Sequence, residues 1–284
     1  MELCAIAVAN SVAVRNLFVN TAKSKKIGLT DTAFQEYDDI SNNCCSIQYF
    51  ATEVYLPMKR SEIQSAIDWA KSLLEKTGFA LPMFAHWTME EWQLRRREAD
   101  TIIKTMRGWD VTTFGHDDFT KMGAVLFTIR NGLLDGSAGC PYAEKLIMMK
   151  EGQILPNHYH AEKTEDIINR GGGVLLIKVY NSLPDGTVDR TGDVRILMDG
   201  IESTVPAGTD VEITRGNSMT IYPGLYHLFT PKPGCGDLIV GEVSSINDDN
   251  TDNYFEEARP RFVPVEEDEP VRVPLCNEYA ELLK

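Results

Sequence analysis

Short apolar runs separated by turn residues dominate the chain after residue 120, and this pattern restricts the fold more than any other feature. The runs are rich in Val, Ile, Leu and Tyr, and turn clusters such as LPDG at 183–186 and PKPG at 231–234 interrupt them. Strands of this length and spacing predict an antiparallel sandwich or a barrel closed on itself. The predicted strands are 124–129, 145–149, 174–180, 194–198, 211–214, 218–222 and 238–243.

Helical periodicity precedes the strands. A first helix is expected from Ser61, with Gln64 completing a candidate capping box and Gly78 ending the helix. A second is expected from Thr88 to Gly108. The first helix should bury one face, because its apolar residues recur at three- and four-residue spacing, at Ile63, Ala66, Ile67, Ala70 and Leu74.

Three segments follow from these patterns. Residues 1–57 show weak periodicity and no recognisable chemistry, so they are expected to form an extension of uncertain order. Residues 58–115 form the helical lead-in, and 116–284 form the β-barrel. The apolar stretch at 3–14 is too short to span a bilayer and lacks a basic flank, and no later segment is expected to cross a membrane.

Charge and cysteine content narrow the partners and the compartment. The chain has 42 acidic and 28 basic residues and a net charge of −14, which disfavours nucleic acid and anionic lipid. A metal ion or a neutral sugar is a more suitable ligand. The six cysteines form no CxxC pair, so reduced thiols in a cytoplasmic protein are expected.

Four side chains are candidates for one metal site. His158 and His160 are two residues apart and would face the same side of an extended strand. The following turn could bring Glu165 onto the next strand, and His227 follows a second turn, Pro223-Gly224. Three imidazoles and one carboxylate would leave a six-coordinate divalent ion with open positions for substrate oxygens. Paired histidines on strands also occur without metals, but the carboxylate and the third histidine favour the metal.

The spacing of these ligands resembles that of the cupin superfamily. The pattern G-x5-H-x-H-x4-E begins at Gly152, and P-G-x2-H ends at His227. This resemblance implies a double-stranded β-helix jelly roll, in which barrels often pair as homodimers. The second motif departs from the usual pattern, because Pro231 stands where an Asn is common.

Longer stretches resemble the D-lyxose isomerases from about residue 58 to about 280. They include WDVTTFG at 109–115, YAEKLIMMK at 142–150, EDIINRGGG at 165–173 and GEVSSINDDNTDNYF at 241–255. The resemblance implies an aldose–ketose isomerase that uses Mn²⁺ to interconvert D-lyxose and D-xylulose, often with D-mannose and D-fructose as further substrates.

Isomerisation through an enediol also needs a base and substrate contacts. Glu242 is the candidate base, because it ends an apolar strand where a carboxylate is desolvated; the alternative is a structural ion pair with Arg261 or Arg170. Lys145 is placed in the active site by the family resemblance and could donate to a sugar oxygen. Asp252, in an acidic loop suited to polyol recognition, and Arg261 are candidate substrate contacts.

Two other functions fit the same ligands. Three histidines and a glutamate can hold Fe²⁺ in an oxygenase, and a cupin can bind a sugar without catalysis. The remaining histidines, His86 and His116, are expected to be structural.

Overall fold

The computed structural model describes residues 55–248 and 251–284. The predicted extension at 1–57 lies almost entirely outside the described residues, and its separation from the lead-in and the barrel stays a prediction. Within the described ranges, no helix has the length and apolarity needed to cross a membrane.

The first predicted helix is α3, Arg60–Thr77. Its apolar stripe is buried as expected. Gly78 ends it with φ 75, where the backbone amide of Phe79 donates to the Leu74 carbonyl. The predicted capping box is wrong: the helix begins one residue before Ser61, and the Glu62 carboxylate accepts from the backbone amide of Lys59.

The predicted second helix starts after Thr88 as expected, with the Thr88 side chain accepting from the Glu91 amide, but its continuation as one helix to Gly108 is wrong. It is divided into α4, Met89–Arg95, and α5, Asp100–Lys104. The Ala99 amide donates to the Arg95 carbonyl, and the Ile103 amide donates to the Ala99 carbonyl. These bonds keep near-helical spacing through the intervening turn, so the periodicity does not reveal the break. The chain then leaves the helical conformation at Met106, with φ 50, and Gly108 begins a strand instead of ending a helix.

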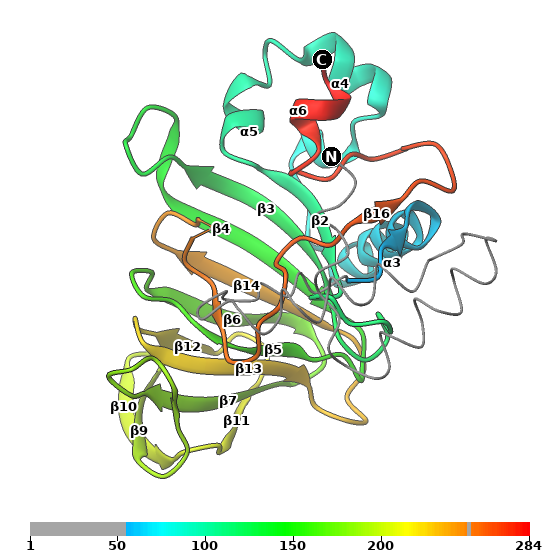
Figure 1. The fold of residues 1–284 in the computed structure, drawn as a ribbon. Coiled ribbons are helices and arrows are strands. Elements are labelled where there is room, and N and C mark those ends of the chain that lie inside the picture. Colours follow the sequence, from blue (N-terminus) through cyan, green and yellow to red (C-terminus); the bar gives the residue numbers. More distant parts are fainter. Residues whose placement is uncertain (1–54, 249–250) are drawn as a thin grey trace, which may run out of the picture. The chain divides into compact units, whose positions relative to one another are not determined.

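Two antiparallel sheets form the body of the described structure (Figure 1). The eight-stranded sheet has the order β10-β9-β12-β6-β14-β4-β3-β2, and the six-stranded sheet has the order β11-β7-β13-β5-β15 with β8 beside β7. The strands of the eight-stranded sheet, in the order of the chain, are β2 Gly108–Thr112, β3 Ala124–Gly132, β4 Gly139–Met149, β6 Glu165–Gly172, β9 Asp193–Met198, β10 Ile201–Pro206, β12 Ser218–Ile221 and β14 Leu238–Ser244. Those of the other sheet are β5 Leu155–Tyr159, β7 Leu175–Ser182, β8 Val188–Asp189, β11 Asp210–Ile213, β13 Leu225–Pro231 and β15 Tyr254–Phe255.

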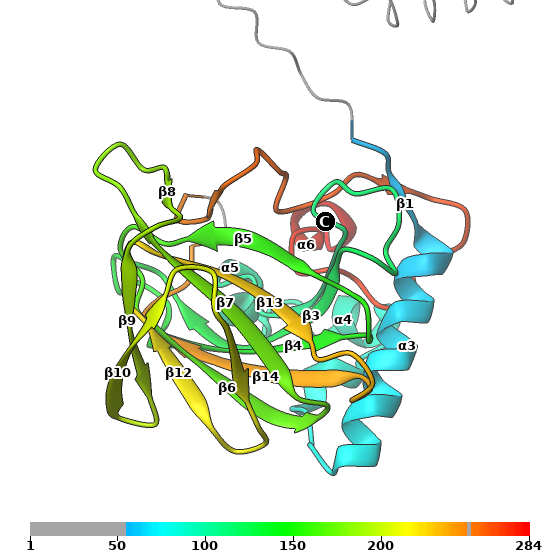
Figure 2. The same ribbon diagram turned by 90° about the horizontal axis from the view of Figure 1, so that it is seen from below.

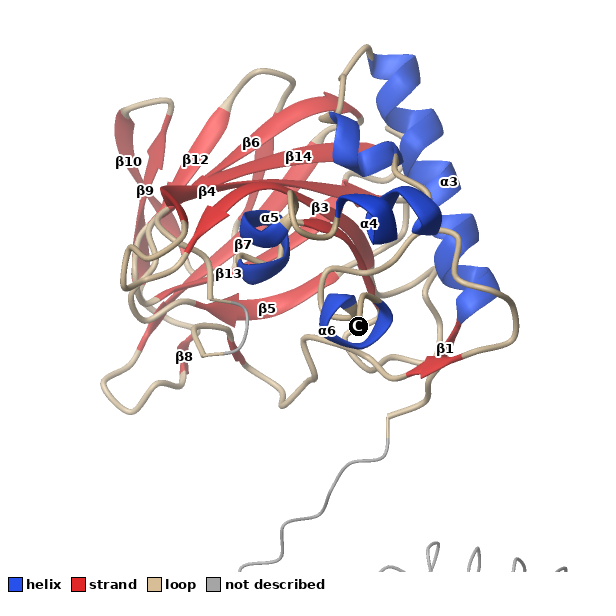
Figure 3. Ribbon diagram, turned by 90° about the horizontal axis from the view of Figure 1, so that it is seen from above, coloured by secondary structure: helices blue, strands red, loops and turns tan. Residues whose placement is uncertain are grey.

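The eight-stranded sheet is covered on both faces. Alternate residues of β3 and β4, such as Phe127 and Leu146, pack against the helices, which gather along one side of the strands (Figures 2 and 3). The residues between them, such as Leu126 and Ile147, meet Phe229 of the other sheet in a second core. Burial on both faces explains why these strands are continuously apolar.

The predicted mainly β, cupin-type barrel is confirmed, and each predicted strand overlaps an observed one. β13 was not predicted, because His227 on its inner face interrupts the apolar run and Pro231 ends the strand. β2 already belongs to the sheet although it lies within the predicted lead-in.

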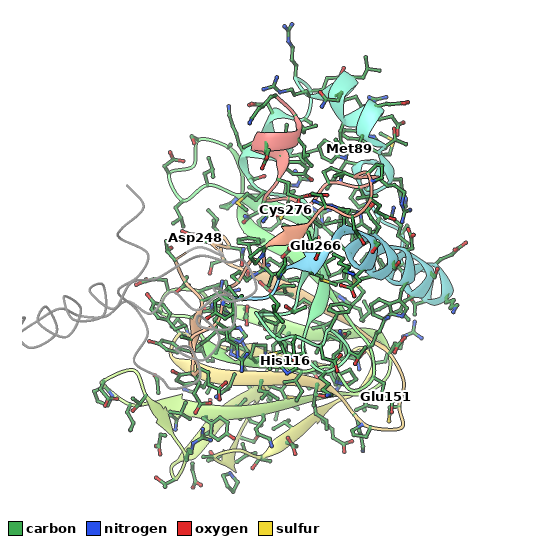
Figure 4. The ribbon with its side chains drawn as sticks, turned by 45° about the vertical axis from the view of Figure 1, so that its right-hand side comes forward. Met89, His116, Glu151, Asp248, Glu266 and Cys276 are labelled. Atoms are coloured by element: carbon green, nitrogen blue, oxygen red, sulfur yellow. The ribbon has the colours of Figure 1, made fainter. Side chains whose placement is uncertain are left out.

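The C-terminal segment packs against the start of α3. β16, Val265–Glu266, pairs with β1, Met58–Lys59, with Glu266 opposite Lys59 in the register. Glu266 is labelled in Figure 4. The fully buried Arg60 guanidinium pairs with Glu267 and with Glu278, just before α6, Tyr279–Leu282. The segment is thereby tied to the helix that covers the barrel.

Candidate metal centre and active site

Three strands, β5, β6 and β13, bring the predicted ligands together inside the barrel. His158 of β5 lies directly opposite His227 of β13 in the strand register. His227 shares the inner face of its strand with Phe229, and Glu165 shares that of β6 with Ile167. His160 follows the end of β5.

Each histidine is oriented by its own backbone contact. The Nδ1 atoms of His158 and His227 lie 2.9 Å from the carbonyl oxygens of Pro156 and Leu225. The His160 Nδ1 contacts the carbonyl of Asp252. A carbonyl can only accept, so each Nδ1 carries the proton and each Nε2 is left as an acceptor. Neutral imidazoles held in this way are suited to bind a cation.

The acceptor atoms converge. One ligand nitrogen from each of the three histidines lies within 4.8 Å of the others. The Glu165 Oε1 lies 3.2 Å from the His227 Nε2 and 3.6 Å from the His160 Nε2. All four side chains are buried. With the proton on Nδ1, the His227 Nε2 and the Glu165 Oε1 are both acceptors, so within the described residues this contact is no hydrogen bond, and it is costly unless a cation binds there.

The electrostatics of the cluster also suit a cation. Burial, followed by the neighbouring His227 and His160, holds the pKa of His158 well below its usual range, so its imidazole is neutral. Burial alone would raise the pKa of Glu165, but Lys163 and His160 outweigh it and lower the pKa, so this carboxylate is ionised. The residues therefore fit a divalent ion held by three neutral imidazoles and one carboxylate.

A group of buried charges lies beside the ligands. The Lys163 Nζ is 2.7 Å from Glu165 Oε2 and 2.9 Å from Glu242 Oε1, and the Lys145 Nζ is 3.8 Å from the same Glu242 oxygen. Burial would lower the pKa of Lys163, but the two carboxylates outweigh it and raise the pKa. The lysine is therefore charged and links the ligand Glu165 to the candidate base.

Lys163 was not identified from the sequence. It lies two residues before Glu165, so a side-chain alternation continued back from β6 would have pointed it toward the same face. The two arginines named as alternative ion-pair partners of Glu242 contact other groups. Arg261 pairs with Asp110 at 2.5 Å, and Arg170 lies against the backbone of Gly241, where a Cβ would come within 2.8 Å of its Nε.

The two candidate substrate contacts occupy different surroundings. Arg261 lines the cavity over the histidines, which measures about 400 Å³ including space open to solvent. The Asp252 carboxylate accepts from the backbone amides of Ala161 at 2.7 Å, Glu162 at 3.3 Å and Lys163 at 3.0 Å. Asp252 therefore holds the turn that joins the candidate ligands His160 and Glu165. Further side chains around the cavity are Phe114, Leu126, Lys145, Ile147, Leu155, Lys163, Phe229, Glu242, Asn253 and Phe255.

Comparison with known proteins identifies the family. The sequence profile described as D-lyxose isomerase matches residues 58–279. The chain belongs to the D-lyxose isomerase family. The D-lyxose/D-mannose isomerase of Escherichia coli O157:H7 is 39% identical over 78% of this chain and 98% of its own length, and that of Serratia proteamaculans is 40% identical with the same coverage. The expectation of a sugar aldose–ketose isomerase is confirmed.

A solved structure supports the fold of this D-lyxose isomerase family member. The L-ribose isomerase of Acinetobacter sp. DL28 aligns over 74% of this chain and 98% of its own, with a TM-score of 0.50 and 14% identity. At that identity the likeness concerns the fold alone.

The remaining histidines of this family member, His86 and His116, come from other segments of the chain than the four candidate ligands. His86 ends the short 3-10 helix η1, Met83–His86. His116 lies in the loop between β2 and β3 (Figure 4), where its Nδ1 accepts from the backbone amide of Asp118. Neither belongs to the candidate metal centre.

Proposed function

We propose that this protein interconverts D-lyxose with D-xylulose, and D-mannose with D-fructose, by proton transfer at a divalent metal centre. The proposed ligands are His158, His160, Glu165 and His227. The observation that carries the proposal is the convergence of three acceptor Nε2 atoms and a carboxylate in a cavity that also holds buried carboxylate and ammonium groups.

The proposed base is Glu242. When bound, the ion would polarise the sugar carbonyl and stabilise negative charge on the enediol oxygens. Glu242 would take the proton from C2 of the open-chain aldose and return it to C1. Lys163, Lys145 and Ser244 all contact its Oε1. Within the described residues none of these contacts is to Oε2, which supports Oε2 as the oxygen that carries the proton.

Lys145 and Arg261 are the proposed polar contacts to the substrate. As C1 gains a proton, the C2 hydroxyl must lose its proton to become the ketose carbonyl. The C1 carbonyl oxygen must gain one to become a hydroxyl. The Lys145 ammonium, 3.8 Å from Glu242, is suited to donate to one of these oxygens. Arg261 lines the same cavity and offers donors to a sugar hydroxyl. Asp252 was expected as a third contact, but its hydrogen bonds favour a role in positioning the ligands.

The proposed ion is Mn²⁺, which the resemblance to the D-lyxose isomerases implies. The donor set of imidazoles and one carboxylate suits first-row divalent metals as a class. Manganese, the homodimer and the cytoplasmic location stay predictions, as does the absence of nucleic-acid partners.

The test uses metal-stripped protein incubated with D-lyxose, D-mannose or D-xylulose, with and without Mn²⁺, and follows formation of the opposite sugar. We expect conversion only with the ion present, and equally in air and without oxygen. Equal yields without metal would contradict the metal mechanism. A requirement for oxygen would favour the oxygenase alternative, and no conversion of any sugar, with metal retained, would favour a binding protein.

A further inference from the structure

We infer that Asn247 is a positioning residue for Lys145, and that Asn131 acts through Asn247. The inference rests on the proposed isomerisation, because it concerns a lysine of that site. Neither asparagine lines the cavity over the histidines. Both line a second cavity of about 890 Å³, including space open to solvent, which Lys145 does not line. They can therefore affect turnover only through the groups that they hold.

Asn247 holds the active-site lysines through one oxygen. Its Oδ1 accepts from the Lys145 Nζ at 2.6 Å and from the Lys163 Nζ at 3.4 Å. Lys145 is 3% exposed and has four rotatable bonds, so its ammonium needs a fixed partner to stay in one place. A short hydrogen bond from the ammonium to a neutral amide oxygen fixes the position without cancelling the charge.

Asn131 in turn holds the backbone of Asn247. Its Oδ1 accepts from the Asn247 amide at 3.1 Å, and its Nδ2 donates to the Asn247 carbonyl at 3.1 Å. The Nδ2 also donates to the Thr105 carbonyl, just after α5, at 3.2 Å. One buried side chain thus pairs with both backbone groups of a single residue, as a residue of a neighbouring antiparallel strand would. This matters because β14 ends at Ser244 and no strand within the described ranges pairs with residue 247.

A bulge in β3 directs Asn131 toward Asn247. The β3–β4 register shifts on both sides of Arg130, and such bulges turn a side chain to a new direction. Two glycines allow the close approach of the strands there. A Cβ on Gly139 would come within 2.2 Å of the Asn131 carbonyl, and one on Gly132 within 2.1 Å of the Cys140 carbonyl. Asp248, which follows Asn247 and ends the first described range, is labelled in Figure 4.

The experiment compares Asn247→Leu with Asn247→Asp in the full-length, metal-loaded protein. Leu keeps the volume and removes the acceptor, whereas Asp keeps an oxygen at the same place. The free energy of a hydrogen bond to a charged group corresponds to about a 10- to 100-fold change in rate, so Asn247→Leu should lower kcat by about that factor. Asn247→Asp should retain kcat within about threefold. The KM for D-lyxose and the bound metal per chain should change little in either variant.

A double-mutant cycle tests the role of Asn131. If Asn131 acts only through Asn247, the single variant Asn131→Ala lowers kcat. The same change made in the Asn247→Leu protein causes no further loss. Asn169→Ala is the matched control: this buried amide also holds backbone carbonyls, those of Gly173 and Ile213, but at the far end of β6. It should lower thermal stability and leave kcat unchanged.

The outcomes separate this inference from the proposed function. A wild-type protein that converts no sugar contradicts the proposed function itself. An active wild type with an Asn247→Leu variant of unchanged kcat overturns the inference alone, as does equal loss in the Leu and Asp variants. If Asn131→Ala does not fold, the comparison at residue 247 still decides the first part, and Asn131→Asp, which keeps only the acceptor, replaces Ala in the cycle.

Discussion

At the scale of single residues, the backbone decides the chemistry of the candidate centre. Pro156 and Leu225 each precede a histidine by two residues and accept its Nδ1 proton through their carbonyls, so local strand geometry sets the tautomer. His160 depends instead on Asp252, from a distant segment. Among the three histidines, the orientation of His160 is therefore the most sensitive to substitutions outside β5.

Glu242→Gln should retain the metal and lose turnover. The amide has nearly the shape of the carboxylate but cannot take the C2 proton, so kcat should fall by about 10²- to 10⁴-fold. Bound metal is measured by elemental analysis and turnover by ketose formation. The control is Glu144→Gln on the neighbouring strand β4, which pairs with Arg130 and should stay active. An active Glu242→Gln protein would exclude Glu242 as the base.

Asp252→Ala should weaken metal binding. It removes the acceptor that holds the backbone amides of residues 161–163 between two ligands. Loss of a group that orients ligands typically weakens metal affinity by about 10- to 100-fold. Competition with a chelator measures the affinity. A raised KM for sugar with unchanged metal affinity would instead restore Asp252 as a substrate contact.

At the scale of elements, strand alternation assigns each side chain to one of two cores. On β14, Leu238 and Val240 face the barrel interior while Ile239 faces the helices, so Glu242 continues the interior row. Lys145 continues the row of Ile147 and Met149 on β4 in the same way. The two lie opposite each other in the β4–β14 register.

The contact between α3 and the C-terminal segment should depend on pH. The hydrogen bond from Arg60 holds the pKa of Glu267 below its ordinary value of 4.5. A lowered pKa in the folded state stabilises the protein above pH 4.5, and the contribution is lost as the pH falls through the folded-state value. Glu267→Gln should therefore lower the melting temperature at neutral pH, and the difference from wild type should shrink by about pH 3.

Glu98→Gln is the control for this pH dependence, because Glu98 forms only an exposed pair with Arg95. Its melting temperature should follow wild type at both pH values. If the difference in melting temperature between Glu267→Gln and wild type stays constant with pH, the ionised pair with Arg60 is not its cause.

At the scale of the whole molecule, the metal should stabilise the fold. Without an ion, the described barrel buries a His227 Nε2 that has no partner. A ligand at a hundredfold excess over its Kd adds about 2.7 kcal/mol to the free energy of unfolding, which predicts a rise in melting temperature of about 5 to 10 °C. His158→Ala should abolish the rise, and His116→Ala, outside the centre, should keep it. An equal rise in both variants would place the ion elsewhere.

Much of the fold could be predicted because local patterns express it. The apolar runs predicted seven of the strands, and spacing grouped His158, His160 and Glu165. The errors arose where tertiary contacts overrule local pattern. The helical period continues through the break between α4 and α5, and β13 was not predicted because the inward-facing His227 interrupts its apolar run.

By itself, the sequence determined the strand-rich fold, the four candidate ligands and the family. These depend on periodicity and spacing, which neighbouring residues encode. Only the tertiary structure decided which charges meet. Lys163 reaches Glu242 across 79 residues of chain, and Asn131 holds Asn247 across 116. Such pairs depend on strand order and register, which are set by how two sheets pack over a shared core and which no short stretch of sequence specifies.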